Sequence, residues 1–98
     1  MTVRRDLLGL LTTRPRSVSS LARDLGLGRR DVGEHLDHVI RSARAAGYRV
    51  IVEPARCRAC GFTFGEQKLT KPGKCPACQG TRLYEAQVRI ESAEEEGL

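Results

Sequence analysis

Apolar residues recur every three or four positions along the first half of the sequence, and this period predicts three amphipathic helices. We expect them over residues Val3–Leu11, Val18–Leu25 and Arg29–Ala46. Their apolar stripes are Val3, Leu7, Leu8 and Leu11 in the first, Val18, Leu21, Ala22 and Leu25 in the second, and Val32, Leu36, Val39, Ile40 and Ala43 in the third. Stripes of this kind are typical of helices that pack against a core.

The residues between the stripes supply the signals that begin and end helices. Thr2 and Ser17 are predicted N-caps, because a side-chain hydroxyl can accept a hydrogen bond from an unpaired N–H group of the first turn. Pro15 is the strongest stop after the first helix, and Gly26-Leu27-Gly28 ends the second. Gly47 stands directly after the third helix, where glycine is the usual residue.

After the third helix the period changes to two, which predicts strands. Tyr48–Glu53 is rich in β-branched residues, and Pro54 suits the end or the edge of a strand. Arg82–Ser92 alternates again, with one apolar face formed by Tyr84, Ala86, Val88 and Ile90. The economical topology pairs Tyr48–Glu53 antiparallel with Leu83–Glu91. The acidic tail at residues 93–98 is expected to be frayed.

All four cysteines lie between the two predicted strands, in the pairs Cys57-Arg-Ala-Cys60 and Cys75-Pro-Ala-Cys78. This spacing is that of a tetrahedral site with four thiolate ligands, so we expect all four cysteines to bind one metal ion. A closed shell of thiolates indicates a structural ion. Zinc is the default metal, and iron would fit the same sulfurs. Gly61 and Gly80 follow the pairs and tolerate the positive φ that such turns often need.

Composition and charge narrow the class of protein. With 98 residues, few aromatic residues and no tryptophan, the chain has a small aliphatic core that a metal ion would stabilise. No apolar stretch is long enough to span a membrane, and we expect a cytoplasmic protein whose paired cysteines bind metal. The net charge is +5, divided into +5 over residues 1–56, +4 over residues 57–82 and −4 over residues 83–98. This excess suits a polyanionic partner, although ordinary surface charge would also account for it.

The segment Ser17–Leu36 resembles the helix-turn-helix of bacterial and archaeal transcription regulators. Ala22 is small enough for two helices to approach closely, and Gly26 suits the turn between them. The wedge between the helices would be filled by Leu21, Leu25, Leu27 and Val32. His35 stands where the family pattern expects an apolar residue, which would shift or rotate the third helix slightly. A three-helix core without a role in DNA binding is the alternative.

Three helices followed by two strands is the element order of a winged helix. The sequence therefore predicts an α+β fold: a winged helix-turn-helix of three helices and a two-stranded wing, with a four-cysteine zinc ribbon inserted between the wing strands. The predicted domains are residues 1–56 with 82–92 for the winged helix-turn-helix, residues 57–81 for the ribbon and residues 93–98 for an acidic flexible tail.

This combination resembles a group of predicted archaeal and bacterial transcription regulators that fuse a winged helix to a rubredoxin-like zinc ribbon. The resemblance covers nearly the whole chain. It rests on Ser17–Leu27, on the helix from Glu34 to Gly47, on the run from Pro54 to Phe62 and on Cys75-Pro76-x-Cys78. The cysteine segment, residues 57–78, is the sharpest of these pieces. It implies one zinc ion bound by all four cysteines and a role in binding DNA.

The predicted DNA contacts are Arg29, Arg30, His38 and Arg41 on the third helix, and Lys68, Lys71 and Lys74 on the loop between the cysteine pairs. Arginine at the start of a recognition helix can read guanine or hold phosphate, and lysine on a wing can grip phosphate beside the groove. Acidic residues on the same exposed half of the helix leave a solvated mixed-charge face as the alternative: Asp31, Glu34 and Asp37. Phe62 and Phe64 are expected to pack under the first knuckle rather than stack on bases.

The predicted function is a DNA-binding transcription regulator whose partner is double-stranded DNA, with a homodimer possible. One alternative is a protein-interaction module of the transcription or RNA-processing machinery. Another is a rubredoxin-like iron protein that carries electrons or senses oxidation. The sequence has no nucleophile–base pair, no paired carboxylates in a glycine-rich pocket and no phosphate loop, so we do not expect an enzyme.

Overall fold

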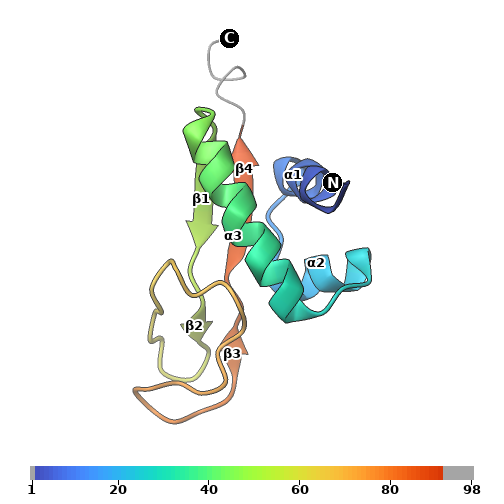
Figure 1. The fold of residues 1–98 in the computed structure, drawn as a ribbon. Helices are drawn as coiled ribbons and strands as arrows, with labels where there is room; N and C mark the ends of the chain where they lie inside the picture. Colours follow the sequence, from blue (N-terminus) through green and yellow to red (C-terminus); the bar gives the residue numbers. More distant parts are fainter. Residues whose placement is uncertain (1, 92–98) are drawn as a thin grey trace.

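The computed structural model describes residues 2–91, and the predicted acidic tail at residues 93–98 lies outside them. Within the described residues three helices come first and four short strands follow (Figure 1). Their bounds are Thr2–Thr13 for α1, Val18–Leu25 for α2, Arg29–Ala45 for α3, Arg49–Glu53 for β1, Arg56–Cys57 for β2, Leu83–Tyr84 for β3 and Gln87–Glu91 for β4. None of the helices in this part of the chain is long and apolar enough to cross a membrane.

The caps that punctuate the helices follow the sequence closely, with one exception. Ser17 caps α2, because its Oγ accepts a hydrogen bond from the backbone N–H of Ser20 at 3.1 Å. Gly26 and Gly47 take left-handed conformations, with φ of 69° and 92°, directly after α2 and in the turn after α3. The exception is the start of α1, which begins at Thr2 itself and so one residue before the predicted start at Val3.

The predicted apolar stripes meet in one core between the three helices and the sheet formed by β1 and β4. Its buried members are Leu7, Leu11, Val18, Leu21, Ala22, Val32, Leu36, Val39, Ile40, Ala43, Val88 and Ile90. His35 is half-buried on α3, and its Nδ1 atom is buried without a hydrogen-bond partner among the described residues. The stripe of α3 is nevertheless buried in full, as the 3.6-residue period predicted.

The strands form two separate antiparallel pairs, of which the sequence predicted one. β1 pairs with β4, with Arg49 opposite Glu91 and Glu53 opposite Gln87, which confirms the expected pairing. The single strand predicted over residues 82–92 is wrong, since β3 leaves this sheet and pairs with β2. Tyr84 therefore does not share the apolar face of Ala86, Val88 and Ile90 but is 47% exposed.

Glu85 marks the point where the chain passes from one sheet to the other. Its Oε2 atom accepts hydrogen bonds from the backbone N–H of Ser19 at 3.1 Å and from the Ser19 hydroxyl at 2.8 Å. Ser19 lies in the first turn of α2, where a carboxylate satisfies unpaired N–H groups and complements the helix dipole. This contact fixes the β3–β4 junction against α2 and accounts for the break in strand alternation.

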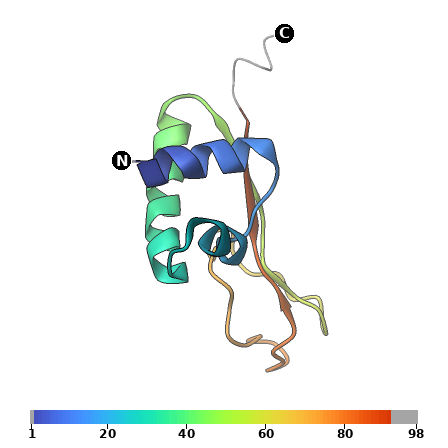
Figure 2. The same ribbon diagram turned by 90° about the vertical axis from the view of Figure 1, so that its right-hand side faces the viewer.

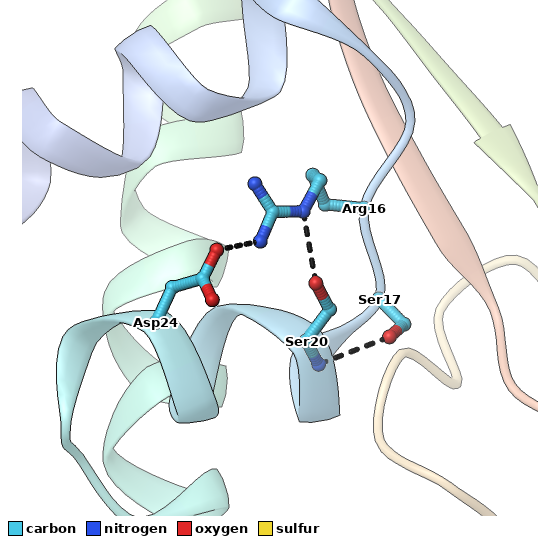
Figure 3. Close-up of polar contacts among 4 residues, drawn as sticks. All are labelled: Arg16, Ser17, Ser20 and Asp24. Atoms are coloured by element: carbon cyan, nitrogen blue, oxygen red, sulfur yellow. Dashed lines mark hydrogen bonds and ion pairs between the residues drawn. The ribbon is translucent and has the colours of Figure 1, made fainter.

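Arg16 joins the α1–α2 connection to both the sheet and the helices. Its backbone exchanges two hydrogen bonds with Val88, N–H to oxygen at 3.0 and 2.8 Å, and so adds one bridge to the edge of β4. Its side chain is only 6% exposed, donates to the Ser20 hydroxyl at 2.9 Å and forms an ion pair with Asp24 (Figure 3). Asp24 is 45% exposed, so the pair lies at the edge of the core. The Arg16 guanidinium, as donor and as nearby charge, lowers the pKa of Asp24.

We predict that Arg16→Ala destabilises the helical half by about 1–3 kcal/mol, because it removes charge-assisted hydrogen bonds from a buried donor. Thermal unfolding followed by circular dichroism at 222 nm measures this. Arg14→Ala, at an exposed neighbour, is the matched control and should leave stability nearly unchanged. The pKa of Asp24 is lower in the folded state. The contribution of its carboxylate to the free energy of unfolding is therefore complete above about pH 4 and is lost as the pH falls below that value. Equal stability of the two variants at neutral pH would contradict this role for Arg16.

Candidate metal centre and adjoining basic surface

The four cysteines lie at the tips of two similar turns that approach each other below β1 and β4. In the first turn, the N–H of Gly61 donates to the carbonyl of Cys57 and the N–H of Cys57 donates to the carbonyl of Phe62. The second turn repeats this pattern with Cys75, Gln79 and Gly80. In each turn the first cysteine is buried and the second is exposed. The two C-x-x-C segments are thus a pair of matching knuckles.

The sulfur positions fit a single tetrahedral metal ion. All four Sγ atoms lie within 4.8 Å of one another. The distances are 3.7 Å between the sulfurs of Cys57 and Cys78 and 3.6 Å between those of Cys60 and Cys75. A zinc ion about 2.3 Å from each of four thiolates would set them ~3.8 Å apart. The site is therefore already close to the geometry that the ion requires, and Cys57, Cys60, Cys75 and Cys78 are the residues that would hold it.

Backbone N–H groups point at the buried sulfurs and make them good anionic ligands. The N–H of Ala59 lies 3.3 Å from the Cys57 sulfur, and that of Ala77 lies 3.4 Å from the Cys75 sulfur. Donation from the N–H of Cys60, and then from that of Ala59, outweighs burial and lowers the pKa of the Cys57 thiol to about 6. One ligand is thus largely ionised before a metal ion arrives.

The exposed cysteines behave in the opposite way in the metal-free site. The N–H of Phe62 lowers the pKa of Cys60, but burial and the sulfurs of Cys75 and Cys57 outweigh it and raise this pKa to about 12. The pKa of Cys78 is also raised: the N–H of Gly80 acts to lower it, and the sulfur of Cys57 acts against that. These protons must leave when a metal ion binds, so metal affinity falls as the pH falls.

Both knuckles need a positive φ at the same position of the turn, and they place different residues there. Gly61 takes a φ of 83°, as predicted, but the matching position in the second knuckle is Gln79, with a φ of 65°. The prediction that Gly80 supplies positive φ is wrong. Gly80 is needed for space instead, because a Cβ atom there would lie 3.2 Å from the Cys78 sulfur. The second knuckle therefore carries the strain of a left-handed non-glycine residue.

A very small apolar core surrounds the site. It consists of Cys57, Cys75 and Leu83, with Phe64 packed against them. The rings of Phe62 and Phe64 meet edge to face with centroids 5.1 Å apart, and Phe62 remains 36% exposed. Phe64 therefore packs at the first knuckle, as the sequence predicted, whereas Phe62 contacts the Phe64 ring but stays exposed and does not pack under the knuckle. A core of this size cannot order some thirty residues by itself, which leaves the metal ion as the main source of order.

The fold and the site define a three-helix protein that carries a four-cysteine zinc ribbon for one zinc ion. Residues 2–51 match the family described as PF0610-like, N-terminal, and residues 54–93 match the PF0610 rubredoxin-like zinc beta-ribbon domain. The chain therefore belongs to the PF0610-like family. This confirms the rubredoxin-like zinc ribbon that the sequence predicted.

The solution NMR structure of protein PF0610 from Pyrococcus furiosus is similar to this chain. The two are 32% identical and superpose with a TM-score of 0.76. The similarity covers 92% of this chain and 89% of that one. None of the curated proteins matches the chain.

The predicted DNA-contact residues of α3 do not form one uniform surface. Arg29 and Arg30 are exposed in the first turn. Arg41 is exposed but forms an ion pair with Asp37 one turn away, at 2.8 Å. His38 lines a shallow hollow of about 300 Å³ between α3 and α1 whose walls include Arg4 and Arg5.

The predicted contact residues of the ribbon are Lys68, Lys71 and Lys74, all on the loop between the two knuckles. Residues between these lysines seat the loop on the helical half. Leu69 packs against the helical core, and a Cβ atom at Gly33 of α3 would lie 3.4 Å from Cγ2 of Thr70. Gly33 follows Arg29 and Arg30 by about one helical turn, or roughly 5 Å. The structure therefore brings Lys71 close to the basic N-terminal turn of α3.

Reasoning from the sequence missed a second group of basic residues, formed by Arg56 in β2, Arg58 directly after it and Arg82 directly before β3. The guanidinium carbons of Arg56 and Arg58 lie 5.1 and 5.2 Å from the centre of the Tyr84 ring. A signal was present in both segments. In Arg56-Cys57-Arg58 and in Arg82-Leu83-Tyr84 one apolar residue stands between two residues with charged or polar ends, which is the alternation of a half-buried strand.

We predict that removal of zinc with a chelator disorders residues 55–84 and leaves the helices folded, because the two apolar clusters are separate. Amide NMR spectra should lose the dispersed signals of the ribbon, while the circular dichroism of the helices is largely kept. Structural zinc binds with an apparent free energy of about 10 kcal/mol or more near neutral pH, so the signals should return when zinc is added back. A cooperative loss of both halves would contradict this independence.

We predict that Gln79→Gly stabilises the zinc-loaded ribbon by about 1 kcal/mol, because glycine adopts a left-handed conformation without the steric penalty of a side chain. Gly61→Ala is the reciprocal variant at the matching position and should destabilise the ribbon by a similar amount. The rate of zinc loss to a chromogenic chelator compares the variants. Faster loss from Gln79→Gly than from the wild type would contradict the strain at this position.

Proposed function

We propose that this protein binds double-stranded DNA as a winged helix-turn-helix transcription regulator, with the zinc ribbon as an extension of its wing. The order of elements supports the class. α1 is followed by a single β-bridge at Arg16, then by α2, α3 and the β1–β4 pair, as in a winged helix. The turn between α2 and α3 supports it further. Gly26 is left-handed there, and the N–H of Leu27 donates to the carbonyl of Ala22 at 3.1 Å.

The observation that carries the proposal is the close approach of Thr70 to Gly33, because it brings together two basic segments that are distant in sequence. Arg29 and Arg30 at the start of α3 then face the same region as Lys71 of the ribbon loop. A recognition helix commonly enters the major groove by its N-terminal end, while flanking lysines neutralise phosphates. On the remainder of the exposed face of α3 the positive charge is balanced by Asp31, Glu34 and Asp37. The expected phosphate contacts are therefore concentrated at the N-terminal end of the helix.

We predict weak, salt-dependent binding to mixed-sequence duplex DNA by the zinc-loaded protein. Four phosphate contacts, from Arg29, Arg30, Lys68 and Lys71, would give a slope of about −3 to −4 in a plot of log association constant against log salt. Arg30→Ala and Lys71→Ala should each lower the magnitude of the slope by roughly 0.9, measured by fluorescence anisotropy. Arg14→Ala removes the same charge away from this surface and should leave the slope unchanged.

Gly33→Leu tests the geometry without changing charge. A larger side chain at this position would push the loop away from α3, so duplex binding should weaken although every basic residue is retained. NMR spectra verify that the variant keeps its helices and its zinc. Absence of duplex binding at low salt by the zinc-loaded wild-type protein would overturn the proposed function.

A further inference from the structure

The outer face of the β2–β3 pair gathers basic and aromatic side chains that duplex binding through α3 does not use. Cys57 and Leu83 point inward to the metal core, and their strand neighbours Arg56 and Tyr84 point outward. Arg58 shares the outward face, because its guanidinium also approaches the Tyr84 ring. The N–H of Arg58 donates to the carbonyl of Arg82 at 2.8 Å, which places these two arginines opposite each other.

The arginines of this face form no ion pair within the part of the chain that the structure describes. Arg16, Arg41, Arg49 and Arg89 each form an ion pair with a carboxylate. Within residues 2–91, none of Arg56, Arg58 and Arg82 does so. Like charges opposite each other on a pair of strands are destabilising, so the folded ribbon retains an unfavourable arrangement here. Stacking of guanidinium groups on Tyr84 holds two of the charges in place at the surface. An anion bound across the face would relieve the repulsion.

The lining of a hollow next to these arginines favours one class of anionic ligand over another. It has a volume of about 240 Å³ and lies beside Tyr84, at the junction of the two sheets. Its walls are Glu53, Pro54, Arg56, Thr63, Tyr84, Glu85 and Gln87. Two carboxylates here would repel the side chains of an acidic peptide. A neutral base could instead donate its exocyclic amino group to a carboxylate and contact the Tyr84 ring, while its phosphate lies on the arginines.

The position of this face separates it from the proposed duplex surface. In Figure 2 the strands lie on the side opposite α3, and the yellow-to-orange loop between the two knuckles lies nearer the helices. A duplex held against the N-terminal turn of α3 would leave the outer face of β2–β3 uncovered. The two surfaces can therefore act independently.

We propose that the outer face of β2–β3, formed by Arg56, Arg58, Arg82 and Tyr84, binds a single nucleic-acid strand. The guanidinium groups hold successive phosphates, and Tyr84 with the adjoining hollow receives a base. Arginine suits this role because its planar fork pairs with phosphate in a bidentate manner. The ribbon thus has a binding surface of its own for single strands, and this proposal does not depend on duplex binding by α3.

Fluorescence anisotropy with labelled single strands of roughly 12 nucleotides, as RNA and as DNA, tests the proposal on the full zinc-loaded chain. The double variant Arg58→Ala/Arg82→Ala should bind single strands about tenfold more weakly at low salt, with a salt slope smaller in magnitude by roughly 1.4. Tyr84→Leu should weaken binding without changing the slope. Arg58→Lys/Arg82→Lys keeps the charge and should keep most of the slope, which excludes simple misfolding as the cause.

A second pair of variants separates the two surfaces. Arg30→Ala/Lys71→Ala should lower duplex binding and leave single-strand binding unchanged, and the ribbon variants should show the reverse. The proposal is overturned if the α3 and loop variant abolishes single-strand binding, or if the ribbon variants bind single strands as the wild type does. Competition by a glutamate-rich peptide of equal charge, as effective as the unlabelled strand, would also overturn it, since it would identify an acidic protein as the partner.

Discussion

Residues 54–86 bury few apolar side chains, so their conformation depends on four sulfur atoms converging on one metal ion. Cys57 and Cys75 form most of the ribbon core, and their sulfurs accept N–H groups that stabilise negative charge. Once the two knuckles are tied together, β2 and β3 are brought side by side and the intervening loop is closed. The loop's lysines and the outward arginines owe their positions to this one coordination shell. The metal acts on function through geometry, because four protein ligands leave no open site for chemistry.

The ribbon is attached to the helices by a small number of specific contacts rather than by a shared core. Leu69 packs on the helical cluster, Thr70 meets Gly33, and Glu85 binds the first turn of α2. The last of these uses a carboxylate to satisfy N–H groups that a helix start leaves unpaired. Arg16 links the α1–α2 connection to the edge of β4 in a comparable manner. Hydrogen bonds of this kind fix the orientation of the ribbon relative to the helices, whereas a purely apolar contact would allow the two halves to shift against each other.

The sequence predicted those parts of the molecule in which a short-range rule decides the outcome. The helices follow the 3.6-residue period, the Ser17 cap follows from its hydroxyl, and the metal site follows from the cysteine spacing. Features that depend on contacts across the chain were missed. Glu85 interrupts the second strand because Ser19, distant in sequence, lies beside it. Gln79 takes the left-handed conformation because its N–H bonds to Cys75 as that of Gly61 bonds to Cys57. The sequence pointed instead to the glycine one residue later.

The distribution of arginines shows why net charge alone is a poor guide to the binding surface. Arg16 is buried and structural, and Arg41 is neutralised by Asp37, so neither adds much to the external field. Arg56, Arg58 and Arg82, which lie in or beside β2 and β3, form no ion pair among residues 2–91, yet reasoning from the sequence did not identify them as a surface. A charge becomes informative once its partners are known, and an uncompensated cluster on a rigid, metal-held sheet is more favourable for binding than the same charges on a mixed helix face. The metal ion fixes the backbone positions from which these arginines extend, which lowers the entropic cost of ordering their side chains when a ligand binds.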